Sequence, residues 1–207
     1  MRLDKPQIEE DLAEFEEIPD EDEYDGMRFV GAEIEYDDLH SREFRNCEFV
    51  RCNFRNCDLT RAGFIDCEFD HCDMAGARLE NAAFIRCRIN CSRMTGADLV
   101  GTLLRHVSLE ACSADFLNLT DVKLDTVMFT DTSLAEASFQ NVVMKRAEMT
   151  GCNLIRATFQ QTPMKGMDMT GNRLQGVGIG FVDLRGMIVT QEQAAELALL
   201  LGLEIRG

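Results

Sequence analysis

Large apolar residues recur at every fifth position through most of this chain. Every fifth residue from Phe29 to Val189 is Phe, Leu, Ile, Met or Val, and the one small residue in that register is Ala114. A helix, with 3.6 residues per turn, does not place such residues on one face, and neither does a strand with its period of two. A repeat that keeps its register over this length indicates a solenoid, in which stacked units share one continuous core.

The residue two places before each large residue is usually small. Every cysteine except Cys91 occupies this second position, and Asp37, Arg42 and Asn172 depart from the rule. Free cysteine behaves as a small buried hydrophobe. We therefore expect two inward side chains in every five residues, with the cysteines filling a narrow interior.

The cysteine pattern argues against a metal site and against a disulfide scaffold. No C-x-x-C pair occurs, although zinc sites favour that spacing, and nine is an odd number for a disulfide framework. Stacked repeats would bring Cys47, Cys67 and Cys87 within disulfide range, but with parallel rather than convergent side chains. The sequence therefore predicts reduced thiols, no metal and no cofactor.

Several five-residue units carry a recognisable signature. The sequence reads CNF at 52–54, CDL at 57–59, ADL at 97–99 and CNL at 152–154. This pattern resembles the pentapeptide-repeat family, A-[DN]-[LF]-x-x, over roughly four-fifths of the chain. The resemblance implies an all-β solenoid, a right-handed quadrilateral parallel β-helix with one repeat on each side, so that residues twenty positions apart stack. We expect this β-helix over residues 27–189.

The segment 1–26 differs in composition from the repeats. It holds twelve carboxylates against Arg2 and Lys5. Its apolar residues are spaced as on one face of a helix that Pro19 would end; they are Ile8, Leu12, Phe15 and Ile18. The sequence predicts an acidic, partly helical N-terminal cap or tail, and an arm that contacts a basic partner is the alternative.

The segment 190–207 predicts a short C-terminal α-helix. Thr190 and Gln193 have the spacing of a capping box, an apolar run follows, and Gly202 is placed to end the helix. Exposed leucines at the end of a solenoid indicate an interaction surface. They can cap the last coil or form a two-fold dimer.

The stretch VDLRGMIVTQEQAAELALLLGLEI, residues 182–205, resembles the ending of Qnr-type quinolone-resistance proteins and related gyrase-immunity proteins. That resemblance implies a homodimer through the C-terminal end, with an interface of Leu197, Leu200, Leu201 and Leu203. It also implies a DNA-mimic rod that binds DNA gyrase or topoisomerase IV and protects it against fluoroquinolones or gyrase poisons. No loop interrupts the repeats here, so inhibition without drug protection stays open.

Outward charges sort by side when residues twenty apart stack. The sides centred on Phe29 and Leu39 are acidic, which would suit a site that normally holds DNA. The predicted partner-binding carboxylates of the Phe29 side are Glu48, Glu68, Asp70, Glu110, Asp131, Glu148 and Asp168, and those of the Leu39 side are Asp58, Asp98 and Asp121.

The side centred on Phe44 has the opposite charge. Its cations include Arg86, Arg105, Lys145, Arg146, Lys165 and Arg185. A solvated charged face is the simpler interpretation of this side, and a phosphate-binding stripe is the alternative.

The remaining features limit the class of function. The net charge of −16 disfavours direct nucleic-acid binding, and no apolar run is long enough to span a membrane. The first residues lack the layout of a secretory signal, so we expect a cytoplasmic protein. His40, His71 and His106 stand apart from one another, and no catalytic motif occurs, which indicates a protein that is not an enzyme. The leading hypothesis is topoisomerase binding, and a structural or interaction scaffold with another protein partner is the alternative.

Overall fold

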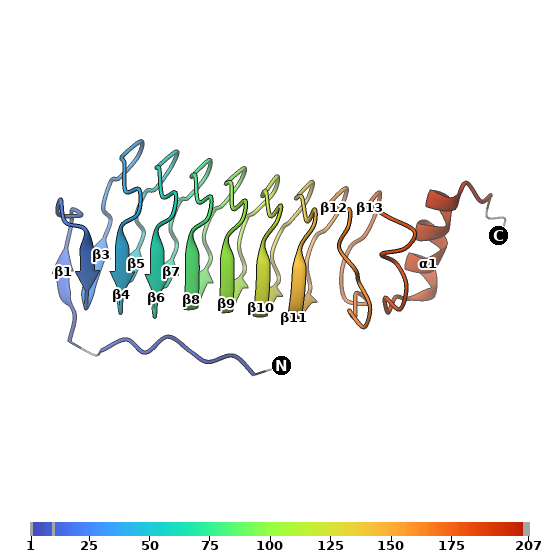
Figure 1. Ribbon diagram of the computed structural model, residues 1–207, viewed down its shortest axis with the longest axis horizontal. Helices are drawn as coiled ribbons and strands as arrows, with labels where there is room; N and C mark the ends of the chain where they lie inside the picture. The colour runs from blue at the N-terminus through green and yellow to red at the C-terminus, as the bar shows by residue number, and fades with distance from the viewer. Residues whose placement is uncertain (1, 10, 205–207) are drawn as a thin grey trace.

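The protein is a parallel β-solenoid of about eight turns that ends in one short helix (Figure 1). The computed structural model describes residues 2–9 and 11–204. The strands are β1 (Ala13–Phe15), β2 (Glu23–Asp25), β3 (Met27–Val30), β4 (Glu43–Arg45), β5 (Glu48–Val50), β6 (Gly63–Ile65), β7 (Glu68–Asp70), β8 (Ala83–Asn90), β9 (Leu103–Glu110), β10 (Lys123–Thr130), β11 (Val143–Thr150), β12 (Thr158–Phe159) and β13 (Gly178–Ile179). The helix α1 (Gln191–Ala198) continues into the 3₁₀ turn η1 (Leu199–Leu201). This architecture confirms the predicted fold class.

Parallel pairing at a separation of twenty residues builds the solenoid. Phe29 pairs with Phe49 across β3 and β5, and Phe44 pairs with Phe64 across β4 and β6. Strands form mainly on the Phe29 and Phe44 sides, whereas bridges such as Glu33 to Asn53 hold most of the other two sides. The repeat therefore fixes which residue lies above which.

Inward aromatic residues stack in columns. The ring centroids of Phe29 and Phe49 are 5.3 Å apart, those of Phe49 and Phe69 are 4.7 Å apart, and the rings of each pair are nearly parallel. Such pairs add about 0.5–1.5 kcal/mol beyond their area burial. The predicted large residues are buried in the core or pack against it, which completes a filled interior.

Each corner of the solenoid places one residue in the left-handed backbone region. Every fifth residue from Gly26 to Gly166 has positive φ, with the sole exception of Arg146. Glycine, asparagine and aspartate tolerate this conformation, but the register also imposes it on Phe116 and Thr126. The closed path of the coil thus overrides local preference.

The predicted N-terminal helix is wrong. The described residues before Met27 contain β1 and β2 and no helix. Phe15 pairs with Phe29 along the free edge of β3, and their ring centroids are 6.0 Å apart. An open sheet edge offers main-chain hydrogen bonds and an exposed core, so the apolar residues cover the first coil as extended chain.

Residues 2–9 continue as an extended arm along a corner of the solenoid. The backbone N–H of Gln7 donates to Asp66 Oδ1 at 3.1 Å, and that of Asp4 donates to His106 Nδ1 at 3.1 Å. These contacts lie two coils apart, so the arm runs back along the rod from its first coil.

We expect Cys91 alone to react rapidly with a thiol reagent in the native protein. Cys91 is exposed, whereas the other cysteines are buried. Burial raises the pKa of Cys57 to about 12, which further disfavours its reactive thiolate. Mass spectrometry after brief alkylation should find one modified thiol, and none in Cys91→Ser. Rapid labelling of several cysteines would contradict this core.

Candidate partner-binding site

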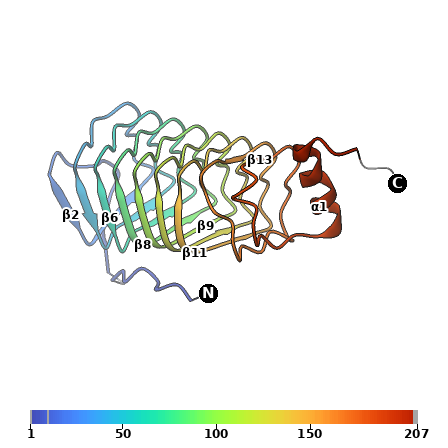
Figure 2. The same cartoon turned by 45° about the vertical axis from the view of Figure 1, so that its right-hand side comes forward.

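The structure places all the predicted partner-binding carboxylates at outward positions. On the Phe29 side, β5, β7, β9 and β11 contain Glu48, Glu68, Asp70, Glu110 and Glu148, whereas Asp131 follows β10 and Asp168 lies one coil after β11. The Leu39 side is the opposite side of the four-sided coil, whose stacked turns Figure 2 shows from a second direction. Most are exposed at least in part, because only the first and third residues of each A-[DN]-[LF]-x-x repeat enter the core. These side chains face outward, as the repeat predicts, but ion pairs with neighbouring arginines reduce the negative charge that some of them present to a partner.

Arginines one coil away compensate three of these carboxylates. Arg28 Nε lies 3.4 Å from Glu48 Oε2, and Arg88 Nη1 lies 3.1 Å from Glu68 Oε1. On the Leu39 side, Arg78 Nη1 lies 3.1 Å from Asp58 Oδ2. Exposed pairs of this kind contribute only about 0.2–1 kcal/mol to stability. They nevertheless reduce the negative field of the earlier coils.

Five predicted carboxylates have no Lys, Arg or His partner within the described residues. They are Asp98, Glu110, Asp121, Asp131 and Asp168. All lie in later coils.

Some of these groups are held in place by neutral donors. The Thr170 hydroxyl and backbone N–H donate to Asp168 Oδ1 at 2.7 and 3.0 Å, and these bonds lower the pKa of that carboxyl. Asn141 Nδ2 donates to Asp121 Oδ1 at 2.6 Å. Asp70 lies 3.0 Å from His71. Hydrogen bonds therefore hold Asp121 and Asp168 in place on the later coils.

The Phe44 side carries a cluster of cations around Asp125. Arg146 Nη2 and Lys145 Nζ lie 3.1 and 3.2 Å from its carboxylate oxygens, and Arg105 Nε lies 3.9 Å away. The hydrogen bond from Arg146, followed by that from Lys145, lowers the pKa of Asp125 to about 2. One carboxylate cannot balance three cations, so this region stays positive.

Other cations of the Phe44 side differ in their environment. Arg86 forms a bidentate pair with Asp66, at 2.7 and 2.5 Å, beneath the N-terminal arm. Lys165 and Arg185 have no carboxylate partner in the described part of the chain. The positive surface is therefore centred on β11 and the coils after it.

The predicted capping box fastens α1 to the solenoid. The N–H of Gln193 donates to Thr190 Oγ1 at 3.2 Å, and Gln193 Oε1 accepts from the Thr190 N–H at 2.9 Å. The side-chain Nε2 of Gln193 also donates to the backbone carbonyls of Met169 and Asn172, both at 2.8 Å. Sequence reasoning found the cap but missed this tether, because its acceptors lie more than twenty residues away.

The leucines predicted for a dimer interface do not share one environment. Leu197 is buried against the last coil, so its side chain closes the core of its own chain. Leu200 and Leu203 are exposed, and the side chain of Leu201 lies outside the described part of the structure. The apolar residues Phe181, Val182, Ile188 and Leu199 are also exposed near this end. A partner would therefore contact the outer leucines rather than Leu197.

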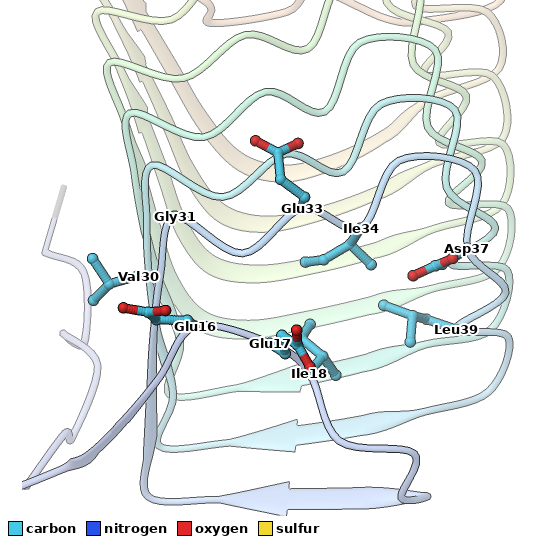
Figure 3. A pocket seen from close by; sticks show the side chains of 9 residues that line it. All are labelled: Glu16, Glu17, Ile18, Val30, Gly31, Glu33, Ile34, Asp37 and Leu39. Carbon is cyan, nitrogen blue, oxygen red and sulfur yellow. The ribbon is translucent and has the colours of Figure 1, made fainter.

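A hollow of about 570 Å³ lies at the opposite end, where the chain first closes (Figure 3). Ile18, Ile34 and Leu39 supply apolar surface, and Glu16 and Glu33 are among the carboxylates around it.

Residues 2–9 and 11–204 contain no group of three or more His, Cys, Asp or Glu side chains able to hold a metal ion. Within those same residues, no helix is long and apolar enough to cross a membrane.

Two family models match the chain. A pentapeptide repeat region matches residues 37–111, and a model of eight pentapeptide repeats matches residues 127–161, so together they span more than half of the sequence. No curated protein matches.

Several solved structures are similar to the chain. QnrB1, a plasmid-mediated fluoroquinolone resistance protein, is 21% identical, with 87% of this chain and 90% of that chain covered and a TM-score of 0.45. HetL of the cyanobacterium Nostoc sp. strain PCC 7120, involved in heterocyst differentiation regulation, is 17% identical, with coverages of 80% and 82% and a TM-score of 0.33. A protein of the Arabidopsis thaliana thylakoid lumen is 22% identical, with coverages of 55% and 66% and a TM-score of 0.23.

We expect Gln193→Ala to loosen α1 from the last coil. The change removes two side-chain hydrogen bonds to the solenoid and one to the helix cap, at a cost of about 1–3 kcal/mol. Hydrogen exchange of the α1 amides should accelerate, while exchange of β5–β9 stays unchanged. Gln191→Ala, at an exposed position of the same helix, is the matched control. Equal exchange in the two variants would show that Gln193 does not hold the helix.

Proposed function

Since the chain belongs to the pentapeptide-repeat family, we propose that it acts through its surfaces as a non-enzymatic binding protein for DNA gyrase or topoisomerase IV. The supporting observation is the acidic surface of the later coils, where carboxylates without Lys, Arg or His partners lie on two opposite sides of the coil. Such a surface complements a basic site that normally holds DNA. The C-terminal sequence that resembles Qnr-type proteins supplies the choice of partner.

The proposed mechanism is competition rather than chemistry. The protein would occupy the DNA-binding surface of the topoisomerase in the cytoplasm and exclude DNA or an enzyme poison from it. Protection against fluoroquinolones and simple inhibition use the same binding step and differ in what is displaced. A supercoiling assay with and without a fluoroquinolone separates them.

The first prediction concerns the acidic surface. Changing Glu110 and Asp131 to lysine should slow association with the topoisomerase by about tenfold at low salt, because electrostatic complementarity steers encounter. The effect should shrink as salt rises and screens exposed charges. Binding kinetics over a salt series are the measurement.

The matched control changes Glu16 and Glu17 to lysine at the N-terminal end, where both are exposed. It alters the net charge equally but leaves the later coils intact. If both variants lose affinity alike, net charge rather than the acidic surface directs binding. If the unmodified protein neither binds the enzyme nor alters supercoiling, the proposed function is wrong.

The second prediction concerns assembly. We propose a two-fold dimer through the C-terminal end, supported by the exposed Leu200 and Leu203. Changing both to glutamate should convert dimers into monomers in light scattering, because burial of like charges opposes association. Tyr36→Glu, at an exposed site of an early coil, should leave the mass unchanged. A monomeric unmodified protein at high micromolar concentration would rule the dimer out.

The positive surface around β11 favours a second candidate, an interaction scaffold for a different protein. Its cations have no role in a purely acidic DNA mimic. This candidate predicts partner binding that survives the Glu110 and Asp131 changes but fails when Lys145 and Arg146 are changed.

A further inference from the structure

The strand β11 is an open sheet edge in the interior of the solenoid rather than at its end. It pairs with β10 alone, although another coil follows it. The sides of Met144 and Met149 therefore lack pairing to the next coil. The other two sides stay joined to it, through the bridge from Asn153 to Arg173 and the pairing of β12 with β13. The solenoid is therefore split on two of its four sides.

The sequence of the next coil explains the split. In other coils the residue before each large residue donates its N–H backwards, as Asn53 does to the carbonyl of Ala32 at 2.8 Å. Pro163 occupies this position opposite β11 and has no N–H to donate. Among the described residues, no backbone hydrogen bond joins 143–150 to 162–171.

The split leaves the N–H groups of Met144 and Met149 available, whereas the Met149 carbonyl already accepts from Asn172 Nδ2 at 2.8 Å. The large residue of each regular repeat donates its N–H to the next coil, as Phe54 does to Asp73 at 2.7 Å. Met144 and Met149 occupy the same position and have no such backbone acceptor in the described structure. A hollow of about 510 Å³ lies beside this edge, between Met149 and Met167. The edge thus offers both donors and space.

Cations flank one half of this edge. The register of β10 and β11 shifts so that Asp125 pairs with Arg146, and Arg146 is the one corner between Gly26 and Gly166 without positive φ. This bulge exposes Lys145 and Arg146 side by side, with Lys165 exposed in the next coil. Bulges that redirect side chains are enriched next to functional sites.

We propose that the free edge of β11 is a docking site for an extended, acidic segment of a partner protein. The segment would add to β11 as a strand, with main-chain hydrogen bonds supplying affinity and the cations selecting carboxylates. Glu148 and Asp168 lie beside the other half of the edge, so the acidic residues of the segment belong over residues 143–146.

The same cations disfavour a second copy of β11 added in parallel register. That arrangement would bring Lys145 and Arg146 against their own counterparts, and like charges on paired strands repel. Lysine, proline and bulges also guard open edges against self-association in other proteins. An acidic strand of a partner protein would instead meet the opposite charge, so Lys145 and Arg146 favour an anionic partner.

The test uses the full chain and a fluorescein-labelled eight-residue peptide. Asp alternates with Val over its first four residues and Thr alternates with Val over its last four, so that its carboxylates lie over residues 143–146 in a parallel alignment. A second peptide of equal charge has two of its valines replaced by proline, which removes main-chain donors. Fluorescence anisotropy should show the first peptide binding and the second binding about tenfold or more weakly. Hydrogen exchange should show new protection of the β11 amides with the first peptide.

The variant that changes Lys145 and Arg146 to glutamate should lose about tenfold or more in affinity for the acidic peptide. Arg61→Glu makes the same kind of charge change on the Leu39 side and should keep the affinity within about twofold. Lys145→Gln with Arg146→Gln should show an intermediate loss if the reversed pair folds poorly.

Three outcomes would overturn the proposal. The first is equal binding of the proline peptide, which would leave charge alone as the cause. The second is oligothymidine that binds this surface as tightly as the peptide, which would make it a general polyanion site. The third is an absence of both binding and β11 protection up to millimolar peptide. None of these measurements involves a topoisomerase, so they do not depend on the proposed function.

Discussion

Each inward side chain of this protein lies against the residue twenty positions later, and the rest of the structure depends on that contact. Phe29, Phe49 and Phe69 stack in one column, with small residues such as Cys47 and Cys67 filling the corners between columns. Interiors pack at nearly crystalline density, so a small residue in one position needs a larger one nearby. Ala114 is small where its register is otherwise large, and Leu117 is large where its register is mostly small. The Leu117 N–H donates to the Ala114 carbonyl, and both residues are buried. The core therefore constrains volume across neighbouring positions and not at each one separately.

This contact also explains how much of the fold the sequence revealed. The five-residue spacing predicted the inward residues and the buried cysteines, and the capping-box pattern predicted the C-terminal helix, because each depends on local order along the chain. The N-terminal segment was mispredicted because its apolar spacing suits a helix, whereas the free edge of β3 offers Phe15 both a partner strand and an aromatic neighbour. The left-handed corners were not foreseen either, since nothing about Phe116 or Thr126 favours that conformation. In the N-terminal segment and at the corners alike, contacts with a neighbouring coil override the backbone conformation that the local sequence favours.

The charged surfaces show the same limit. Sorting charges by side located the acidic residues, and stacking at twenty residues also places Arg28 beside Glu48 and Arg88 beside Glu68, so these pairs could have been predicted from the sequence. The same rule places Arg105 and Lys145 beside Asp125, but the added contact of Arg146 could not have been predicted, because it needs a bulge that no sequence spacing indicates. Pro163 lies within an uninterrupted register, yet its missing N–H removes one bond of the ladder and opens β11.

A rod built this way presents charges at fixed separations. Neighbouring strands lie about 4.8 Å apart, and the packed core prevents that spacing from adapting to a partner. Fixed geometry lowers the entropy cost of binding for a partner that fits and offers little to one that does not. The regular coils suit a partner with a regular array of opposite charge, and the proposed topoisomerase surface that normally holds DNA is one such partner. The split beside β11 is the exception in the proposal above, because an open edge donates hydrogen bonds to any extended chain and leaves selection to Lys145 and Arg146. Regular and interrupted parts of one solenoid thus impose different requirements on what they bind.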